Sequence, residues 1–150
     1  MTLHLAQMNI GRMRAPIDSP IMAGFVARLA EINALAEASE GFVWRFQGEG
    51  GNATYLRPYD DPLIIFNMSV WTSVEALQRY AYTSAHRELL RARSSWFEKF
   101  DGPFQAMWWI PAGHEPTVEE AKKKLAYLRT HGDSQHAFSF ARPFPPLLLA

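Results

Sequence analysis

Hydrophobic and polar residues alternate along this chain with two different periods. The two-residue period, typical of strands with one buried face, predicts strands at residues 3–13, 42–47, 63–71 and 104–110. Along the third strand, one set of side chains alternates with another: Ile64, Phe66, Met68 and Val70 against Ile65, Asn67, Ser69 and Trp71. We therefore expect these two sets on opposite faces of a sheet.

Helical periodicity fills the intervals between these strands. An apolar stripe predicts a first helix from Pro20 to a stop at Gly41. The stretch 72–100 is predicted to be helical in two pieces, with a break at Thr83–Ser84 that supplies a new N-cap. Asp101-Gly102-Pro103 should end this region.

A third helix is predicted from Thr117, where T-V-E-E forms a capping box with Glu120, to Gly132. The aromatic tail after it is expected to form a short edge strand or an extended flap. Gly48–Asn52 lacks the spacing of a phosphate-binding loop and is predicted to be a hairpin loop.

The order β-α-β-β-α-β indicates an α+β, ferredoxin-like antiparallel sheet with an added C-terminal helix and tail. We expect one domain, residues 1–150, with its core at about 3–112 and the helix and tail at 113–150. The helices are expected to cover the apolar face of the sheet. The other face would then be bare and apolar enough to need a second copy of the chain, which predicts a homodimer with a barrel-like interior.

Composition narrows the classes of function. Fifteen basic residues balance fifteen acidic ones, which disfavours a nucleic-acid partner. Cysteine is absent, and the five histidines show no metal-ligand spacing, so no metal site is expected. No signal peptide and no run of about 20 apolar residues is found, so we expect a cytoplasmic protein with no membrane partner.

The run MWWIPAGHEPTVEEAKKKLAYLRTHGDSQHAFSF resembles an uncharacterised bacterial family, a domain of unknown function, in the dimeric α/β-barrel superfamily. The segment from the third strand into the helix is distantly similar to the antibiotic-biosynthesis monooxygenases. This resemblance implies pocket roles for Asn67 and Trp71, four residues apart, and for an arginine at Arg91. Leu77 stands where those enzymes have a tyrosine, and Tyr80 is a loose substitute.

The haem-degrading branch of that superfamily uses an asparagine, a tryptophan and a histidine. Asn9 matches the first of these, whereas Tyr80 and Leu90 stand at the other two positions.

The residues themselves suggest a catalytic set of Asn67, Trp71 and His86. The Asn67 amide would stabilise an oxyanion, Trp71 would stack on a planar ring, and His86 would act as a general base. Substrate contacts are expected from further side chains: Gln7, Asn9, Ser69, Tyr80 and Arg91. Each also has a structural interpretation, as a sheet hydrogen bond, an end-of-strand packing residue or a solvated surface group.

Three functions remain open from the sequence. The first is a cofactor-independent, monooxygenase-like enzyme that acts on a planar aromatic substrate. The second is a non-catalytic small-ligand binder or sensor with the same pocket. The third is a haem-handling protein, for which His86 is the plausible axial ligand. All three predict a small-molecule partner, and the first two need no cofactor.

Overall fold

The structure is a computed structural model that describes residues 2–47 and 58–146. Its elements, in chain order, are β1 (Leu3–Met13), η1 (Pro20–Met22), α1 (Ala23–Ala38), β2 (Phe42–Arg45), β3 (Ile64–Trp71), α2 (Val74–Ala81), α3 (Ser84–Trp96), β4 (Phe97–Glu98), β5 (Gln105–Pro111) and α4 (Val118–His131). The hairpin loop predicted at Gly48–Asn52 lies outside the described residues. The predicted strands and the helix break at Thr83 are confirmed.

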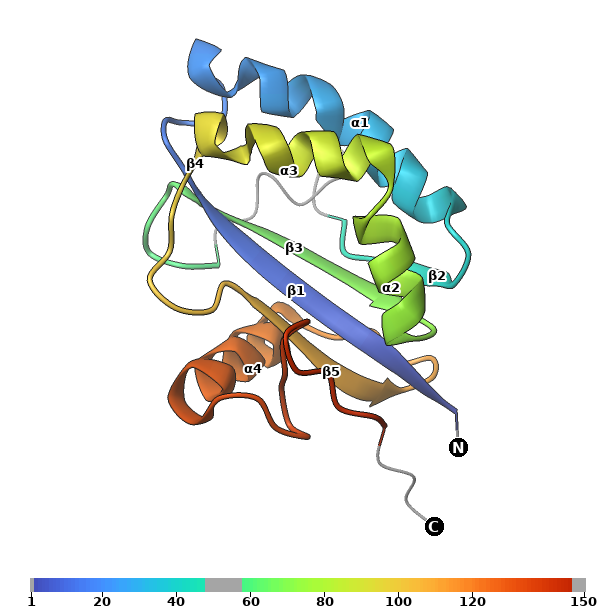
Figure 1. The fold of residues 1–150 in the computed structure, drawn as a ribbon. Coiled ribbons are helices and arrows are strands. Elements are labelled where there is room, and N and C mark those ends of the chain that lie inside the picture. Colours follow the sequence, from blue (N-terminus) through green and yellow to red (C-terminus); the bar gives the residue numbers. More distant parts are fainter. Residues whose placement is uncertain (1, 48–57, 147–150) are drawn as a thin grey trace.

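The antiparallel sheet has β1 and β3 at its centre, which confirms the ferredoxin-like α+β fold (Figure 1). β2 pairs with β3 on one side, and β5 pairs with β1 on the other. The short β4 extends the β5 edge by pairing with Arg12 and Met13. The central register sets Gln7 opposite Ser69 and Asn9 opposite Asn67, so the polar residues of two strands share one face.

The two faces of the sheet are covered by different helices (Figure 1). We call the face that bears Gln7, Asn67 and Trp71 the cavity face, and the opposite one the apolar face. Helices α1, α2 and α3 lie over the cavity face, whereas α4 packs on the apolar face. The apolar face and its α4 partners form one buried cluster, which includes Ala6, Met8, Ile10, Phe66, Met68, Val70, Ala121, Leu125 and Leu128.

The prediction that the helices after strands one and three cover the apolar face is therefore wrong. The small and branched residues of α4, Ala121 and Leu125 among them, complement the apolar strands and bury them within one chain. The face that was expected to be bare, which bears Gln7 and Trp71, is covered by α1, α2 and α3, and both of these side chains are buried without a second copy. The homodimer thus loses that support and stays a prediction.

Local chemistry explains where the helices begin and end. The Ser73 hydroxyl accepts a hydrogen bond from the Ala76 N–H (3.1 Å) and caps α2. α3 ends at Trp96, earlier than predicted, because Phe97 turns into the β4 pairing with β1. α1 ends at Ala38, and Gly41 follows with φ 88°, where an added Cβ would lie 2.4 Å from the Ala76 Cβ.

The Thr117 cap of α4 is confirmed, since its hydroxyl accepts from the Glu120 N–H (3.1 Å). The Glu120 carboxylate accepts from the Trp108 indole N–H and contacts the His114 ring, each at 2.8 Å, and so ties α4 to β5. Beyond α4, the tail meets β5 through one pair of 2.9 Å backbone hydrogen bonds between Phe138 and Met107. The expected edge strand is thus a single bridge.

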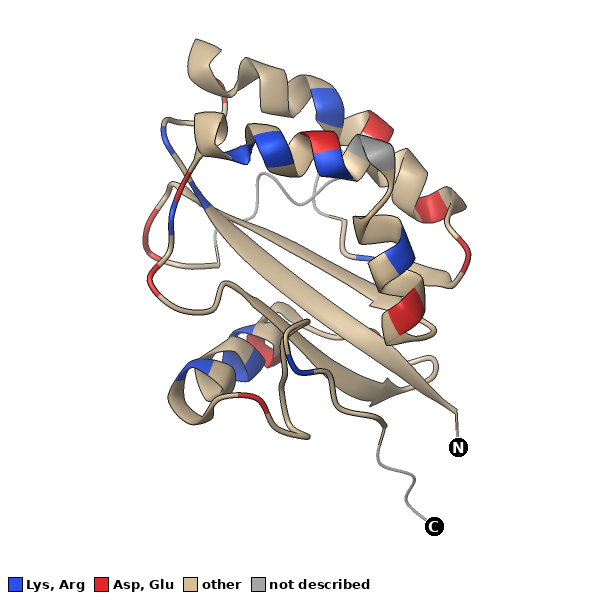
Figure 2. Cartoon of the chain, viewed as in Figure 1, with Lys and Arg blue, Asp and Glu red and all other residues tan. Residues whose placement is uncertain are grey.

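Charged side chains gather on the helices and on the loops at the strand ends, leaving the centre of the sheet almost free of charge (Figure 2). At one such end, Arg12 bonds Asp61 (2.7 Å) and Glu98. The Arg12 bond, together with a hydrogen bond from the Leu63 N–H, holds the pKa of the Asp61 carboxyl below its usual range. No helix within the described ranges is long and apolar enough to cross a membrane.

Candidate functional site: a cavity between the sheet and its helices

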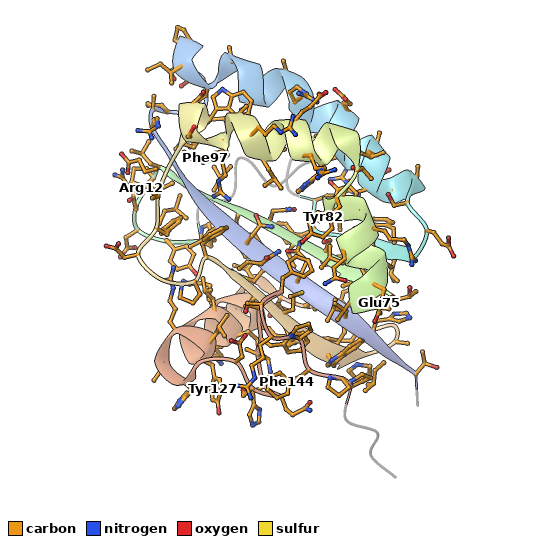
Figure 3. The ribbon with its side chains drawn as sticks, viewed as in Figure 1. Arg12, Glu75, Tyr82, Phe97, Tyr127 and Phe144 are labelled. Atoms are coloured by element: carbon orange, nitrogen blue, oxygen red, sulfur yellow. The ribbon has the colours of Figure 1, made fainter. Side chains whose placement is uncertain are left out.

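A cavity of about 360 Å³ lies between the cavity face of the sheet and helices α1, α2 and α3. Its volume falls in the range typical of small-ligand sites. Tyr82 and Phe97, which lie near the two ends of α3, mark its length (Figure 3). Gly11 also lines the cavity. A glycine is needed at this position because an added Cβ would lie 2.9 Å from the Phe97 ring.

Seven of the eight predicted site residues line this cavity: Gln7, Asn9, Asn67, Ser69, Trp71, Tyr80 and His86. They come from β1, β3, α2 and α3, segments that the antiparallel register and the α2–α3 turn bring together. Arg91 is the exception. Its side chain is exposed, and it is not among the residues that line the cavity.

Gln7 is the centre of a hydrogen-bond network on the cavity floor. Its amide nitrogen donates to the Ser69 hydroxyl (2.7 Å), which also accepts from the Trp71 indole N–H (2.9 Å). Its amide oxygen accepts from Asn9 (3.2 Å) and Gln105 (3.3 Å). Gln7 and Ser69 are buried, so these bonds hold the floor in one arrangement.

Asn67 behaves differently from the rest of the floor. It lies in the middle of a central strand, yet its side chain is exposed, because the cavity opens above it. Its amide forms no hydrogen bond within the part of the chain that the structure describes. Asn67 therefore has a donor and an acceptor to offer to a ligand.

Aromatic rings close one end of the cavity. The Trp71 ring stacks on Tyr80, with centroids 5.1 Å apart at 25°, and meets Phe42 edge-on at 5.5 Å. The Tyr80 hydroxyl donates to the Ile32 carbonyl of α1 at 3.3 Å. Burial raises the pKa of Tyr80 to about 12, so its phenol stays protonated at neutral pH.

His86 meets the Tyr80 ring at 5.0 Å, close to edge-on. Burial lowers the pKa of the His86 imidazole, and a backbone hydrogen bond at Ala81 partly opposes this shift. Its Nδ1 is buried and finds no hydrogen-bond partner among the described residues. The ring is therefore neutral at physiological pH, the state that a general base requires.

The sequence reasoning missed Arg93, Arg45 and the aromatic wall at the far end, where Phe25, Trp96 and Phe97 pack together. Arg93 lies seven residues after His86, two helical turns further along the same face of α3. This spacing would have identified it. The resemblance to the monooxygenases selected Arg91 instead, because their pocket arginine falls at Arg91 when no gap is placed across the break at Thr83.

No aspartate or glutamate appears among the described residues that line the cavity. Nor does that part of the chain contain a group of three or more His, Asp or Glu side chains placed to hold a metal ion. The groups that line the cavity therefore include side-chain amides, a neutral imidazole, aromatic rings and two arginines.

The fold is that of an α+β, ferredoxin-like domain with a cavity of small-molecule size between its sheet and helices. The chain belongs to the family described as domain of unknown function DUF3291, whose profile matches residues 4–148. None of the curated proteins is significantly similar to it.

Several solved structures share the fold. A protein from Shewanella oneidensis has a TM-score of 0.53 at 9% identity, covering 73% of this chain and 93% of its own. A conserved protein from Methanosarcina mazei Go1 has a TM-score of 0.50 at 11% identity, with 73% and 92% covered. SnoaB, a cofactor-independent oxygenase from Streptomyces nogalater, has a TM-score of 0.48 at 18% identity, with 75% and 95% covered. At these identities the likeness concerns the fold alone.

Proposed function

We propose that the protein is a cofactor-independent, monooxygenase-like enzyme for a planar aromatic compound with an acidic C–H or O–H group. The observation that carries the proposal is the Asn67 amide, which has no hydrogen bond among the described residues and is exposed to an aromatic-walled cavity from the middle of a central strand. An amide N–H donor that faces the cavity would stabilise charge that develops on a substrate oxygen.

In the proposed reaction, His86 takes a proton from the substrate and Asn67 donates a hydrogen bond to the resulting enolate oxygen. The planar anion lies at the aromatic end of the cavity, where Tyr80 stacks on the buried Trp71. It gives its electrons to O₂, so that one oxygen atom forms a new ring C=O and the other leaves as water. The substrate supplies the electrons, and the reaction therefore uses no cofactor. The neutral state of His86 supports its part as the base.

Oxygen uptake with 1,8-dihydroxyanthrone tests the proposal. We expect uptake well above the spontaneous rate, and a loss of about 100-fold in Asn67→Ala, as for removal of one oxyanion donor. Gln47→Ala is the matched control, because Gln47 is an exposed amide outside the cavity lining. Uptake no faster than with heat-denatured protein would rule out this activity for the anthrone class.

The same site supports a second candidate, a non-catalytic binder of planar compounds. The buried network around Gln7 favours it, because a floor fixed in one arrangement suits binding without turnover. A binder would show ligand-dependent stabilisation that follows RT ln(1 + [L]/Kd) while the ligand stays unconsumed. The predicted homodimer is a separate proposal, which light scattering tests.

A further inference from the structure

Helix α3 presents three kinds of side chain to the cavity in a row. His86 comes first, Leu89 and Leu90 follow one turn later, and Arg93 lies another turn on. At 1.5 Å per residue, the seven residues from His86 to Arg93 span about 10 Å of helix. The wall that α3 contributes is thus neutral at the His86 end, apolar in the middle and cationic at the Arg93 end.

Arg93 is half-buried, and burial lowers the pKa of its guanidinium. Its guanidinium carbon lies 4.7 Å from the centroid of the Phe104 ring, which holds the group at the cavity wall. No carboxylate within the described ranges pairs with it. The other arginine in the lining, Arg45, is bonded to Glu37 at 2.7 Å. Arg45 is therefore already paired with a carboxylate, whereas Arg93 has no carboxylate partner among the described residues.

A half-buried cation without a partner is unfavourable, and a fork of N–H donors that faces a cavity is a site for a carboxylate. We propose that the ligand is a planar aromatic acid whose carboxylate binds Arg93 beside Phe104. Its rings extend toward Trp71 and His86. The carboxylate-free lining favours the same ligand, because no acidic side chain there repels it. The inference rests on the proposed function for the aromatic nature of the ligand.

Two quinones with the same ring system isolate the carboxylate. We would titrate 4,5-dihydroxyanthraquinone-2-carboxylate and its 2-hydroxymethyl analogue into the protein and follow tryptophan fluorescence, since Trp71 and Trp96 line the cavity. Both compounds are already quinones, so binding is measured without turnover. The acid should bind about 10-fold more tightly, as a charge-assisted hydrogen bond predicts.

Arg93→Gln should reduce that preference to about one, whereas Arg91→Gln, on the exposed side of the same helix, should keep it. Arg93→Lys retains the charge and should keep part of the preference, which covers the case in which the glutamine variant misfolds. Equal affinities in the parent protein, no binding of either quinone, or a preference that survives Arg93→Gln each overturns the inference. Failure of anthrone turnover would instead remove the proposed reaction while the acid preference stands.

Discussion

The two faces of one sheet show how a single alternating sequence produces both a fold and a site. On the apolar face, Met8 and Met68 are sealed under α4. On the cavity face, the same strands present Gln7, Asn9 and Asn67 to a space of about 360 Å³. Residues that are neighbours in sequence thus fill the core on one side of the sheet and line a cavity on the other.

The difference in packing has a cause in side-chain size. On the apolar face, Ala106 and Ala121 pack beside the larger Phe66 and Trp108, and small and large side chains together fill the space between α4 and the strands. On the cavity face, large rings stand at both ends: Trp71 against Tyr80 at one, Phe25 against Phe97 at the other. These rings hold the helices away from the middle of the sheet. The cavity is the space left between them.

Truncating a leucine on the apolar face should have the largest effect on stability. Leu125→Ala removes a fully packed side chain under the sheet, and we expect a loss of about 2–5 kcal/mol in the free energy of unfolding. Leu29→Ala is the matched control, because this half-buried leucine lines the cavity, and it should cost less than about 2 kcal/mol. Urea denaturation measures both. Equal losses would mean that the two faces are packed alike.

Breaking the network on the cavity floor should come next. Gln7→Leu leaves the buried Ser69 hydroxyl and the Gln105 amide without their Gln7 partner, and about 1–3 kcal/mol should be lost. Gln105→Leu removes only one bond, of 3.3 Å, and should cost less. If the two variants are equally stable in urea, the floor is not organised around Gln7.

The buried imidazole predicts a smaller, pH-dependent effect. Because the pKa of His86 is lowered on folding, the unfolded chain binds a proton first as the pH falls below about 6.5. Stability should then decrease with acidification, by no more than about 1.4 kcal/mol per pH unit for one proton, until the folded-state pKa is passed. His86→Gln should remove this component. Parallel stability–pH curves for the variant and the parent protein would contradict it.

Much of the fold could be predicted from the sequence, because strand periodicity, Ser73 and Thr117 caps and the break at Thr83 are local signals. The face of the sheet that each helix covers could not be predicted from the sequence. An amphipathic stripe shows that a helix is buried on one side, but the connections decide against which surface. α4 therefore went unrecognised as the cover of the apolar face.

The site was predictable where it lies on strands and less so where it lies on helices. Alternation places Gln7, Asn67 and Ser69 on one face of the sheet, and all three line the cavity. Arg93 was not selected, because Arg91 was taken from an ungapped match to the monooxygenases, whereas the arginine that faces the cavity depends on the helical phase after the break at Thr83. Phe140 was also missed as a wall residue, since only the tertiary path of the tail brings it to the cavity.

The smallest expected effect on stability belongs to Asn67, and it separates function from folding most sharply. Asn67→Ala removes an exposed amide that has no bond in the described structure, so the melting temperature should change by less than about 2 °C. The same substitution should abolish most anthrone-dependent oxygen uptake. Differential scanning fluorimetry measures the melting temperature, and oxygen uptake on the same preparation measures the activity. A melting temperature that falls as far as in Gln7→Leu would show that Asn67 supports the floor, and the site would then lose its free donor.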